Sequence, residues 1–227
     1  MQTEITERVE KIKAELSKGN PFGEQVILVA ATKMQTAEAI NEAVLAGVDA
    51  VAENKPQEFR DKNDLVLPCP RHFIGHLQTN KIKYLIGKID LYHSCDRDDL
   101  AGELAKKSRE KGIVSNVLLQ INVGAEESKG GYMYESAKET FARLNQTDGL
   151  CVKGFMAMLP ETDDEKLLRA LAKKMRALYD WGRVQSNNVV YLSMGMSGDY
   201  ALCVEEGSNM IRVGSTIFGR REYGVTV

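Results

Sequence analysis

Lys33 ends an apolar run near the start of the chain. Residues 26–29 read VILV and residues 30–32 read AAT. Such a run is typical of a strand buried on both faces of a parallel sheet. An ammonium group at that strand end must reach water or a partner. Lys33 is therefore either a lysine whose stem snorkels to solvent or a nucleophilic amine for Schiff-base chemistry, and this stretch alone fits both.

Two glycine-containing segments near the C-terminus have the composition of an anion site. Residues 195–199 read GMSGD, with Ser197 at their centre, and residues 214–216 read GST, with Ser215. The first joins an expected strand to an expected helix, where free N–H groups and the helix dipole favour an anion, and the second follows the last expected strand with similar residues. The alternative is that both segments are ordinary glycine turns with helix caps and bind no ligand. Barrels, however, commonly bind phosphate with the loops after their last two strands, so we expect a phosphate site here.

Arg212 lies two residues before Gly214 on the expected last strand. Side chains alternate along a strand, so Arg212 shares a face with Met210, and we expect it to point into the mouth of a barrel. Its partner is either an acidic residue or a ligand. A lysine, an anion cradle and this arginine fit a ligand with a phosphate at one end and a carbonyl at the other. Pyridoxal 5′-phosphate and a sugar-phosphate aldehyde both satisfy that description.

Strands and helices alternate about eight times along the chain. The expected strands are residues 26–29, 48–54, 71–76, 89–94, 116–123, 150–158, 189–194 and 210–213. Helical spacing over residues 5–16 predicts an additional N-terminal helix, and Asp96 or Asp98 is expected to cap the helix that ends near residue 110. This pattern predicts one (β/α)8 TIM-barrel domain spanning residues 1–227, with its site at the carboxyl ends of the strands. The alternative is an open doubly wound sheet, but the GxGxxG fingerprint that usually follows its first strand is absent from this sequence.

Composition excludes several classes of protein. The net charge is −2 in 227 residues, and no basic arm is visible, which argues against nucleic-acid binding. No apolar run is long enough for a membrane span, and the N-terminus is too polar for a signal peptide. The four cysteines and three histidines lack metal-ligand spacing. We therefore expect a cytoplasmic protein with reduced thiols and no metal.

Several longer motifs resemble one family. They are VAATK at 29–33, ENKPQE at 53–58, HFIGHLQTNK at 72–81, ESKGG at 127–131, LSMGMSGD at 192–199 and RVGSTIFGR at 212–220. In these motifs the chain is similar to the pyridoxal phosphate homeostasis proteins, cytosolic single-domain relatives of the alanine racemase N-terminal barrel. The likeness extends from the first helix to Arg220. It implies a barrel of pyridoxal phosphate fold type III.

The resemblance also implies roles for particular residues. Lys33 would carry the cofactor as an internal aldimine, and Arg212 would face the pyridine nitrogen. The phosphate would be held by Ser197, Gly214 and Ser215, and the ring would be lined by Asn54 and Met194. The family usually has serine where Ala31 stands and reads GENY where residues 52–55 read AENK, differences that fall on the rim of the site.

The expected function is that of a pyridoxal phosphate binder and carrier in vitamin B6 homeostasis. Arginine at the pyridine nitrogen weakens the electron sink on which most catalysts of this kind depend. Racemases of this fold add a second base from another domain, and the sequence leaves no length for one. Apo pyridoxal phosphate enzymes are the expected recipients, and a monomer or weak dimer is expected. The alternatives are a racemase-like enzyme of low activity and a sugar-phosphate aldolase.

Lys129 and Lys81 are further lysines in the motifs of the family. Lys129 lies on the loop after the fifth strand, beside two glycines. From there it either reaches the mouth as a second acceptor of the cofactor or stays solvated.

Overall fold

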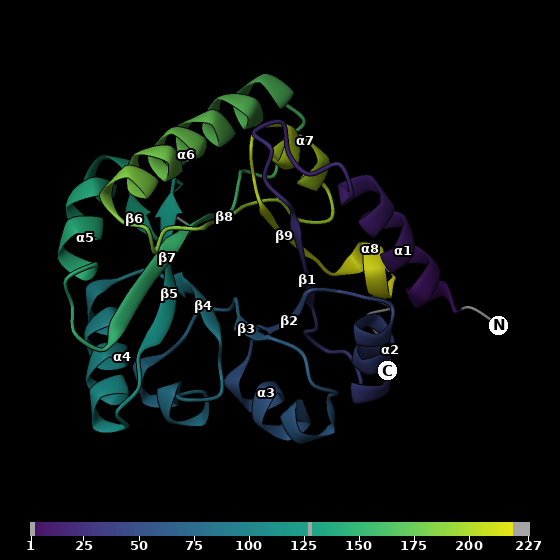
Figure 1. Cartoon of the computed structure of the whole chain (residues 1–227), viewed down its shortest axis with the longest axis horizontal. Coiled ribbons are helices and arrows are strands. Elements are labelled where there is room, and N and C mark those ends of the chain that lie inside the picture. The colour runs from purple at the N-terminus through teal and green to yellow at the C-terminus, as the bar shows by residue number, and fades with distance from the viewer. Residues whose placement is uncertain (1–2, 127–128, 220–227) are drawn as a thin grey trace, which may run out of the picture.

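A closed parallel barrel forms the centre of the computed structural model, which describes residues 3–126 and 129–219. The sheet order is β4-β3-β2-β1-β9-β8-β7-β5-β6, and a further pairing of β4 with β5 closes the ring (Figure 1). The eight strands of the ring are β1 Ile27–Ala31, β2 Ala50–Glu53, β3 Arg71–Phe73, β4 Leu91–Cys95, β5 Ser115–Asn122, β7 Leu150–Ala157, β8 Tyr191–Ser193 and β9 Met210–Val213. The predicted (β/α)8 barrel is confirmed.

A short strand that the sequence did not predict lies outside this ring. β6 spans Tyr132–Met133 and pairs in parallel with Ile121 and Asn122 at the end of β5. From the sequence, the loop that carries Lys129 was expected to lead directly into a helix over residues 135–144. β6 extends the sheet beside the mouth of the barrel, so the loop after β5 is tied to the strand that it leaves.

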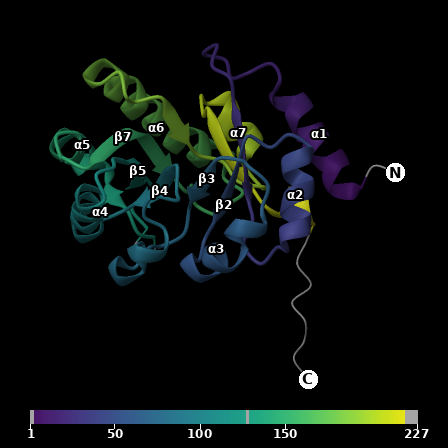
Figure 2. The same cartoon turned by 60° about the horizontal axis from the view of Figure 1, so that its bottom comes forward.

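Helices surround the barrel on its outer side (Figures 1 and 2). The α-helices are α1 Glu4–Leu16, α2 Ala37–Leu45, α3 Pro56–Lys62, α4 Asp98–Glu110, α5 Ala137–Leu144, α6 Glu165–Gln185, α7 Tyr200–Glu205 and α8 Ser215–Phe218. Three 3-10 helices are η1 Asn63–Leu65, η2 Thr79–Tyr84 and η3 Tyr134–Ser136. The predicted N-terminal helix is α1, which packs against α2 and α8 and buries Val9, Ile12 and Leu16.

The predicted cap of α4 is wrong. Arg97 is the N-cap residue and provides no side-chain capping bond, while Asp98 is already in the first turn. Asp98 Oδ1 accepts from Arg143, and Asp96 accepts from Arg97 and contacts His76. Both carboxylates therefore bond to side chains, and neither caps the helix. Residues 79–84, which begin within the HFIGHLQTNK motif, form the 3-10 helix η2.

The apolar core has two parts, one inside the barrel and one between the barrel and its helices. The interior cluster is lined by Val29, Ala50, Ala52, Leu91, Leu118, Met156 and Met210, all of which come from strands. Larger clusters fill the space between strands and helices. Within the part of the chain that is described, no helix is both long and apolar enough to cross a membrane.

Candidate functional site

A cavity of about 330 Å³ opens at the carboxyl ends of the strands. Its walls are formed by Ala31, Lys33, Asn54, Ile74, Met158, Met196, Ser197, Gly198, Arg212, Gly214 and Ser215. Six of the seven predicted site residues are thus brought to one cavity from four strands, β1, β2, β8 and β9, or the turns that follow them. The seventh, Met194, is fully buried in the core between strands and helices and does not line the cavity.

The residues on either side of Lys33 are each bonded to a glutamate. Thr32 Oγ1 donates to Glu53 Oε1 at 2.8 Å, and Met34 N donates to Glu58 Oε2 at 2.7 Å. Met34 has φ 61°, the left-handed region that non-glycine residues seldom adopt. The hydrogen bond from its amide to Glu58 fixes this turn, so Lys33 leaves β1 in a defined direction.

Lys62 ties these glutamates together from α3. Its Nζ donates to Glu53 and Glu58, and also to the backbone carbonyls of Thr32 at 3.2 Å and Gln35 at 3.3 Å. Burial opposes ionisation of Glu58, but the bond from Met34 and the charge of Lys62 outweigh it, and the pKa of Glu58 is lowered. The sequence alone did not indicate this cluster, although Glu53 and Glu58 lie within the ENKPQE motif.

The two glycine-containing turns meet, as an anion cradle requires. Ser197 Oγ accepts from Gly214 N at 3.4 Å and from Thr216 N at 3.3 Å. The loop after β8 is thereby joined to the start of α8 after β9. A Cβ added at Gly198 would have no atom within 4 Å, so the missing side chain keeps this part of the cavity open.

Arg212 is buried without a carboxylate partner among the described residues. Its NH1 donates to Ser193 O at 2.9 Å and to Ser193 Oγ at 2.7 Å, and its NH2 donates to Ala157 O at 3.0 Å. Burial lowers the pKa of Arg212 to about 10. These bonds use three of the five N–H donors of a guanidinium, which leaves two for a ligand in the cavity. Of the two partners expected for Arg212, the acidic one is not found in the described part of the chain.

Asn54 supplies an unpaired polar atom at the same cavity. Its Oδ1 is buried and has no hydrogen-bond partner among the described residues. Buried polar atoms normally have a partner, so an orphan beside a cavity is typical of a ligand site. Together with Lys33 and the two spare donors of Arg212, Asn54 gives a donor and acceptor set that fits a small aromatic aldehyde with a phosphate tail.

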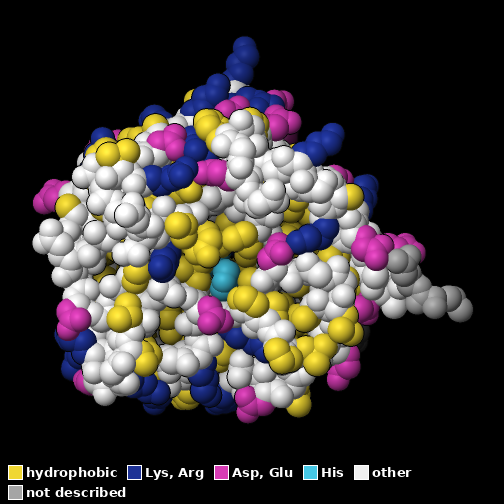
Figure 3. Space-filling view, viewed as in Figure 1, with side chains coloured by type: hydrophobic (Ala, Val, Ile, Leu, Met, Phe, Trp, Pro, Cys, Tyr) yellow, Lys and Arg dark blue, Asp and Glu magenta, His cyan; other side chains and the backbone are white. Residues whose placement is uncertain are grey.

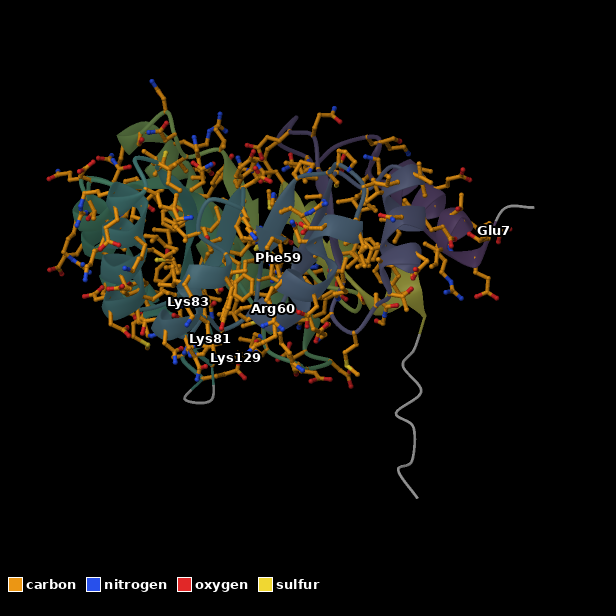
Figure 4. The ribbon with its side chains drawn as sticks, turned by 90° about the horizontal axis from the view of Figure 1, so that it is seen from below. Glu7, Phe59, Arg60, Lys81, Lys83 and Lys129 are labelled. Carbon is orange, nitrogen blue, oxygen red and sulfur yellow. The ribbon has the colours of Figure 1, made fainter. Side chains whose placement is uncertain are left out.

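A second cavity of about 410 Å³ adjoins the first and shares Met158, Met196 and Gly198 with it. Lys129 lines this second cavity, where its Nζ donates to Leu159 O at 3.0 Å and pairs with Glu126 at 2.7 Å. Lys129 is therefore held by two partners and is not freely solvated, which was one of the two alternatives expected from the sequence. Lys81 lies over the Tyr84 ring, and Figure 4 places Lys81 and Lys129 along the same edge of the molecule.

Two buried histidines form a hydrogen-bonded chain inside the barrel, which the spacing of the histidines in the sequence did not indicate. His93 Nε2 lies 3.0 Å from His72 Nδ1, and His93 Nδ1 lies 3.1 Å from Ser193 Oγ. Burial lowers the pKa of His72 to about 4, and burial with the charges of His72 and Arg212 lowers that of His93. No group of three potential metal ligands is found within the described residues.

Acid is expected to destabilise the fold through His72. Because its pKa is about 4 in the folded chain against 6.5 as the ordinary value, the unfolded chain binds a proton here first. The stability that the neutral residue contributes is complete above pH 6.5 and is lost as the pH falls towards 4. We expect a loss of about 2 kcal/mol in the free energy of unfolding between about pH 7.5 and pH 5.

Urea unfolding at several pH values measures this effect. His72→Asn should flatten the pH dependence by that amount. His76→Asn is the matched control, because the His76 side chain is 65% exposed. An unchanged slope in His72→Asn would contradict the assignment.

The family model described as "Alanine racemase, N-terminal domain" matches residues 3–222 of the chain. A curated relative from Aquifex aeolicus, named pyridoxal phosphate homeostasis protein, is 37% identical over 222 residues, 96% of each chain. A protein of the same name from Escherichia coli strain K12 is 33% identical and is covered over 94% of its length, as is this chain.

Solved structures share the fold. PipY of Synechococcus elongatus, solved with PLP bound, is similar with a TM-score of 0.82 and 30% identity over 95% of this chain and all of that one. An alanine racemase from Clostridium difficile matches with a TM-score of 0.75 at 16% identity, and the match covers 97% of this chain and 58% of the racemase. At that identity the second match shows only the barrel fold.

Proposed function

The chain belongs to the pyridoxal phosphate homeostasis proteins, built on the barrel of the alanine racemase N-terminal domain, and on this premise we propose that it binds pyridoxal 5′-phosphate on Lys33 and carries it to apo enzymes. Its relatives carry the homeostasis name, and PipY is described with PLP bound. Carriage of the cofactor and the lysine linkage are the steps that this proposal adds.

One observation carries the proposal. Lys33, Arg212 and the two turns around Ser197 and Ser215 line a single cavity. The amine of Lys33 condenses with the aldehyde to form a C=N bond and release one water, and hydrolysis returns the free aldehyde. The backbone N–H groups of the turns and the Ser197 hydroxyl would hold the phosphate. Arg212 would direct its two spare donors at the pyridine nitrogen, and Asn54 would bond a polar substituent of the ring.

The same cavity favours a carrier over a racemase. A racemase needs a proton-exchanging group on each face of the cofactor. Among the described residues that line the cavity, Lys33 and Arg212 are the only ones with ionisable side chains. A guanidinium at the pyridine nitrogen opposes its protonation and weakens the electron sink. A low-activity racemase and a Schiff-base aldolase stay as alternatives for the experiment to decide.

An absorbance spectrum of the purified protein tests the proposal. We expect a band above the aromatic region that borohydride removes, with the reduced adduct mapped to Lys33. The loaded protein should then activate an apo enzyme and exchange no α-proton of added amino acids. A protein that stays colourless with added cofactor, or a turnover of α-protons comparable to that of a racemase, would overturn it.

We further propose that transfer proceeds in the cytoplasm from a monomer or weak dimer. All four cysteines, at positions 69, 95, 151 and 203, are free thiols, as suits a reducing compartment. Lys129 is a candidate for a second acceptor during transfer, because its cavity adjoins the one that contains Lys33 and shares three residues with it.

A further inference from the structure

Arg212 sits at the end of a chain of side chains that passes through the barrel. We call Ser193, His93 and His72 the axial chain. Ser193 Oγ contacts both Arg212 and His93, and His93 contacts His72. All three residues are at least nine-tenths buried and come from β8, β4 and β3 respectively. At its far end, His72 lines a cavity of about 350 Å³ with Asp49, Asp90, Lys153 and Tyr191.

This far cavity lies at the opposite mouth from Lys33. It is formed by residues at the amino-terminal ends of strands, among them Ile27, Leu91 and Met210. In Figure 3 a histidine lies near the centre of the face in view, with hydrophobic side chains beside it and acidic and basic side chains around them. The axial chain therefore spans the barrel from one mouth to the other.

The charge of Arg212 fixes the direction of every hydrogen bond in the axial chain. Its NH1 donates to Ser193 Oγ, so the hydroxyl proton of Ser193 is free to be donated to His93 Nδ1. His93 then carries its proton on Nε2 and donates it to His72 Nδ1. Both imidazoles are neutral in this arrangement, in agreement with the lowered pKa of each.

A buried guanidinium without a carboxylate must be stabilised by dipoles. Ser193 supplies two of the three oxygen atoms that accept from Arg212, its carbonyl and its hydroxyl. The hydroxyl accepts best when its own proton has a fixed acceptor, since chains of hydrogen bonds polarise one another. His93 is that acceptor, and His72 in turn holds the tautomer of His93.

We propose that the axial chain positions Arg212, so that Ser193, His93 and His72 set the orientation and strength of the guanidinium that faces the pyridine nitrogen. This inference rests on the proposed function, because it takes the cofactor ring to lie against Arg212. The three residues touch no ligand themselves and act through Arg212. Loss of the axial chain frees the guanidinium to turn away, and the pyridine nitrogen then takes a proton more readily.

Ser193→Ala removes the hydroxyl and leaves the carbonyl. We expect it to weaken cofactor binding about tenfold, the effect of one charge-assisted hydrogen bond. In the bound cofactor, the titration of an isotope-labelled pyridine nitrogen, followed by NMR, should move to higher pH. Ser193→Thr keeps a hydroxyl and should restore both values. The buried hydroxyl pair of Ser108 and Ser115, 2.7 Å apart, offers Ser108→Ala as a control for the loss of a buried hydroxyl.

His93 provides a second pair of variants. An asparagine amide reaches the place of Nδ1 and can still accept from Ser193, whereas a glutamine amide reaches the place of Nε2 and cannot. His93→Asn should therefore keep the wild-type titration, and His93→Gln should behave like Ser193→Ala. Equal affinity and equal titration in wild type, Ser193→Ala and His93→Gln, with the cofactor fixed on Lys33 in each, would overturn the axial chain alone. Failure of borohydride to fix cofactor on Lys33 in the wild type would instead overturn the proposed function.

Discussion

Lys33→Ala is expected to abolish the borohydride-stable adduct and the absorption band above the aromatic region. Lys33 is the only lysine among the described residues that line the candidate cavity. The variant keeps Arg212 and the cradle of the two turns, so phosphate and ring contacts remain. Cofactor should bind weakly and exchange freely, and equilibrium dialysis with the spectrum of the dialysed protein measures both.

Two further variants separate the covalent bond from charge and from general loss of a lysine. Lys33→Arg keeps the positive charge but forms no stable C=N bond under these conditions, so it should also stay colourless. Lys153 lines the cavity at the other mouth of the barrel, and Lys153→Ala should keep the wild-type adduct. A stable adduct in Lys33→Ala, mapped to another lysine, would refute the assignment of Lys33.

Alternation of side chains decided which parts of the site the sequence could predict. The barrel followed from eight apolar strands with helices between them, and Lys33 and Arg212 from their places at strand ends. Met194 was assigned to the ring by resemblance alone. On β8, however, Ser193 contacts Arg212 inside the barrel, so the next residue must face the helices, and Met194 is buried there. If the alternation of side chains along a strand had been applied to β8, Met194 would not have been predicted to line the cavity.

The axial chain was within reach of the same rule. Leu91 belongs to the interior cluster, and His93, two residues later on β4, shares its face. His72 pairs with Leu91 in the register of β3 and β4. The period indicates inward side chains, but it does not say which atoms meet across the barrel. Distances of about 3 Å between residues far apart in sequence depend on strand stagger, which no local pattern contains.

Hydrogen bonds to the backbone were the least accessible part of the site. At the turn after Lys33, Met34 adopts the left-handed conformation although it is not a glycine, so the sequence contains no residue that indicates a turn there. Its conformation depends on Glu58 from α3, and Glu58 depends on Lys62. The contacts within this cluster are made by tertiary packing. A sequence motif that contains Glu53 and Glu58 indicates that the segment matters, but not which atoms these residues bind.

Gly75→Ala is expected to damage both stability and cofactor binding. A Cβ at this position would lie 1.9 Å from Asn54 O and 2.6 Å from Asn54 C, so the turns after β2 and β3 would have to separate. These are backbone atoms, which cannot rotate aside as a flexible side chain does. Ile74 N donates to Glu53 O at 2.9 Å and so joins these two turns, while Ser94 Oγ of β4 donates to Gly75 O and fixes the turn after β3 on its other side. We expect a loss of about 3 kcal/mol or more in the free energy of unfolding.

The same displacement moves Asn54 at the candidate cavity. Cofactor affinity, measured below the melting temperature of the variant, should fall about tenfold, as for the loss of one hydrogen bond to a buried polar group. Gly102→Ala is the matched control, because Gly102 lies on α4 outside the cavity and an added Cβ there has no neighbour within 4 Å. It should be no less stable than the wild type and should bind cofactor as the wild type does. If Gly75→Ala unfolds and binds cofactor as Gly102→Ala does, the close approach of the two turns does not set the position of Asn54, and the polar contact assigned to it must come from another group.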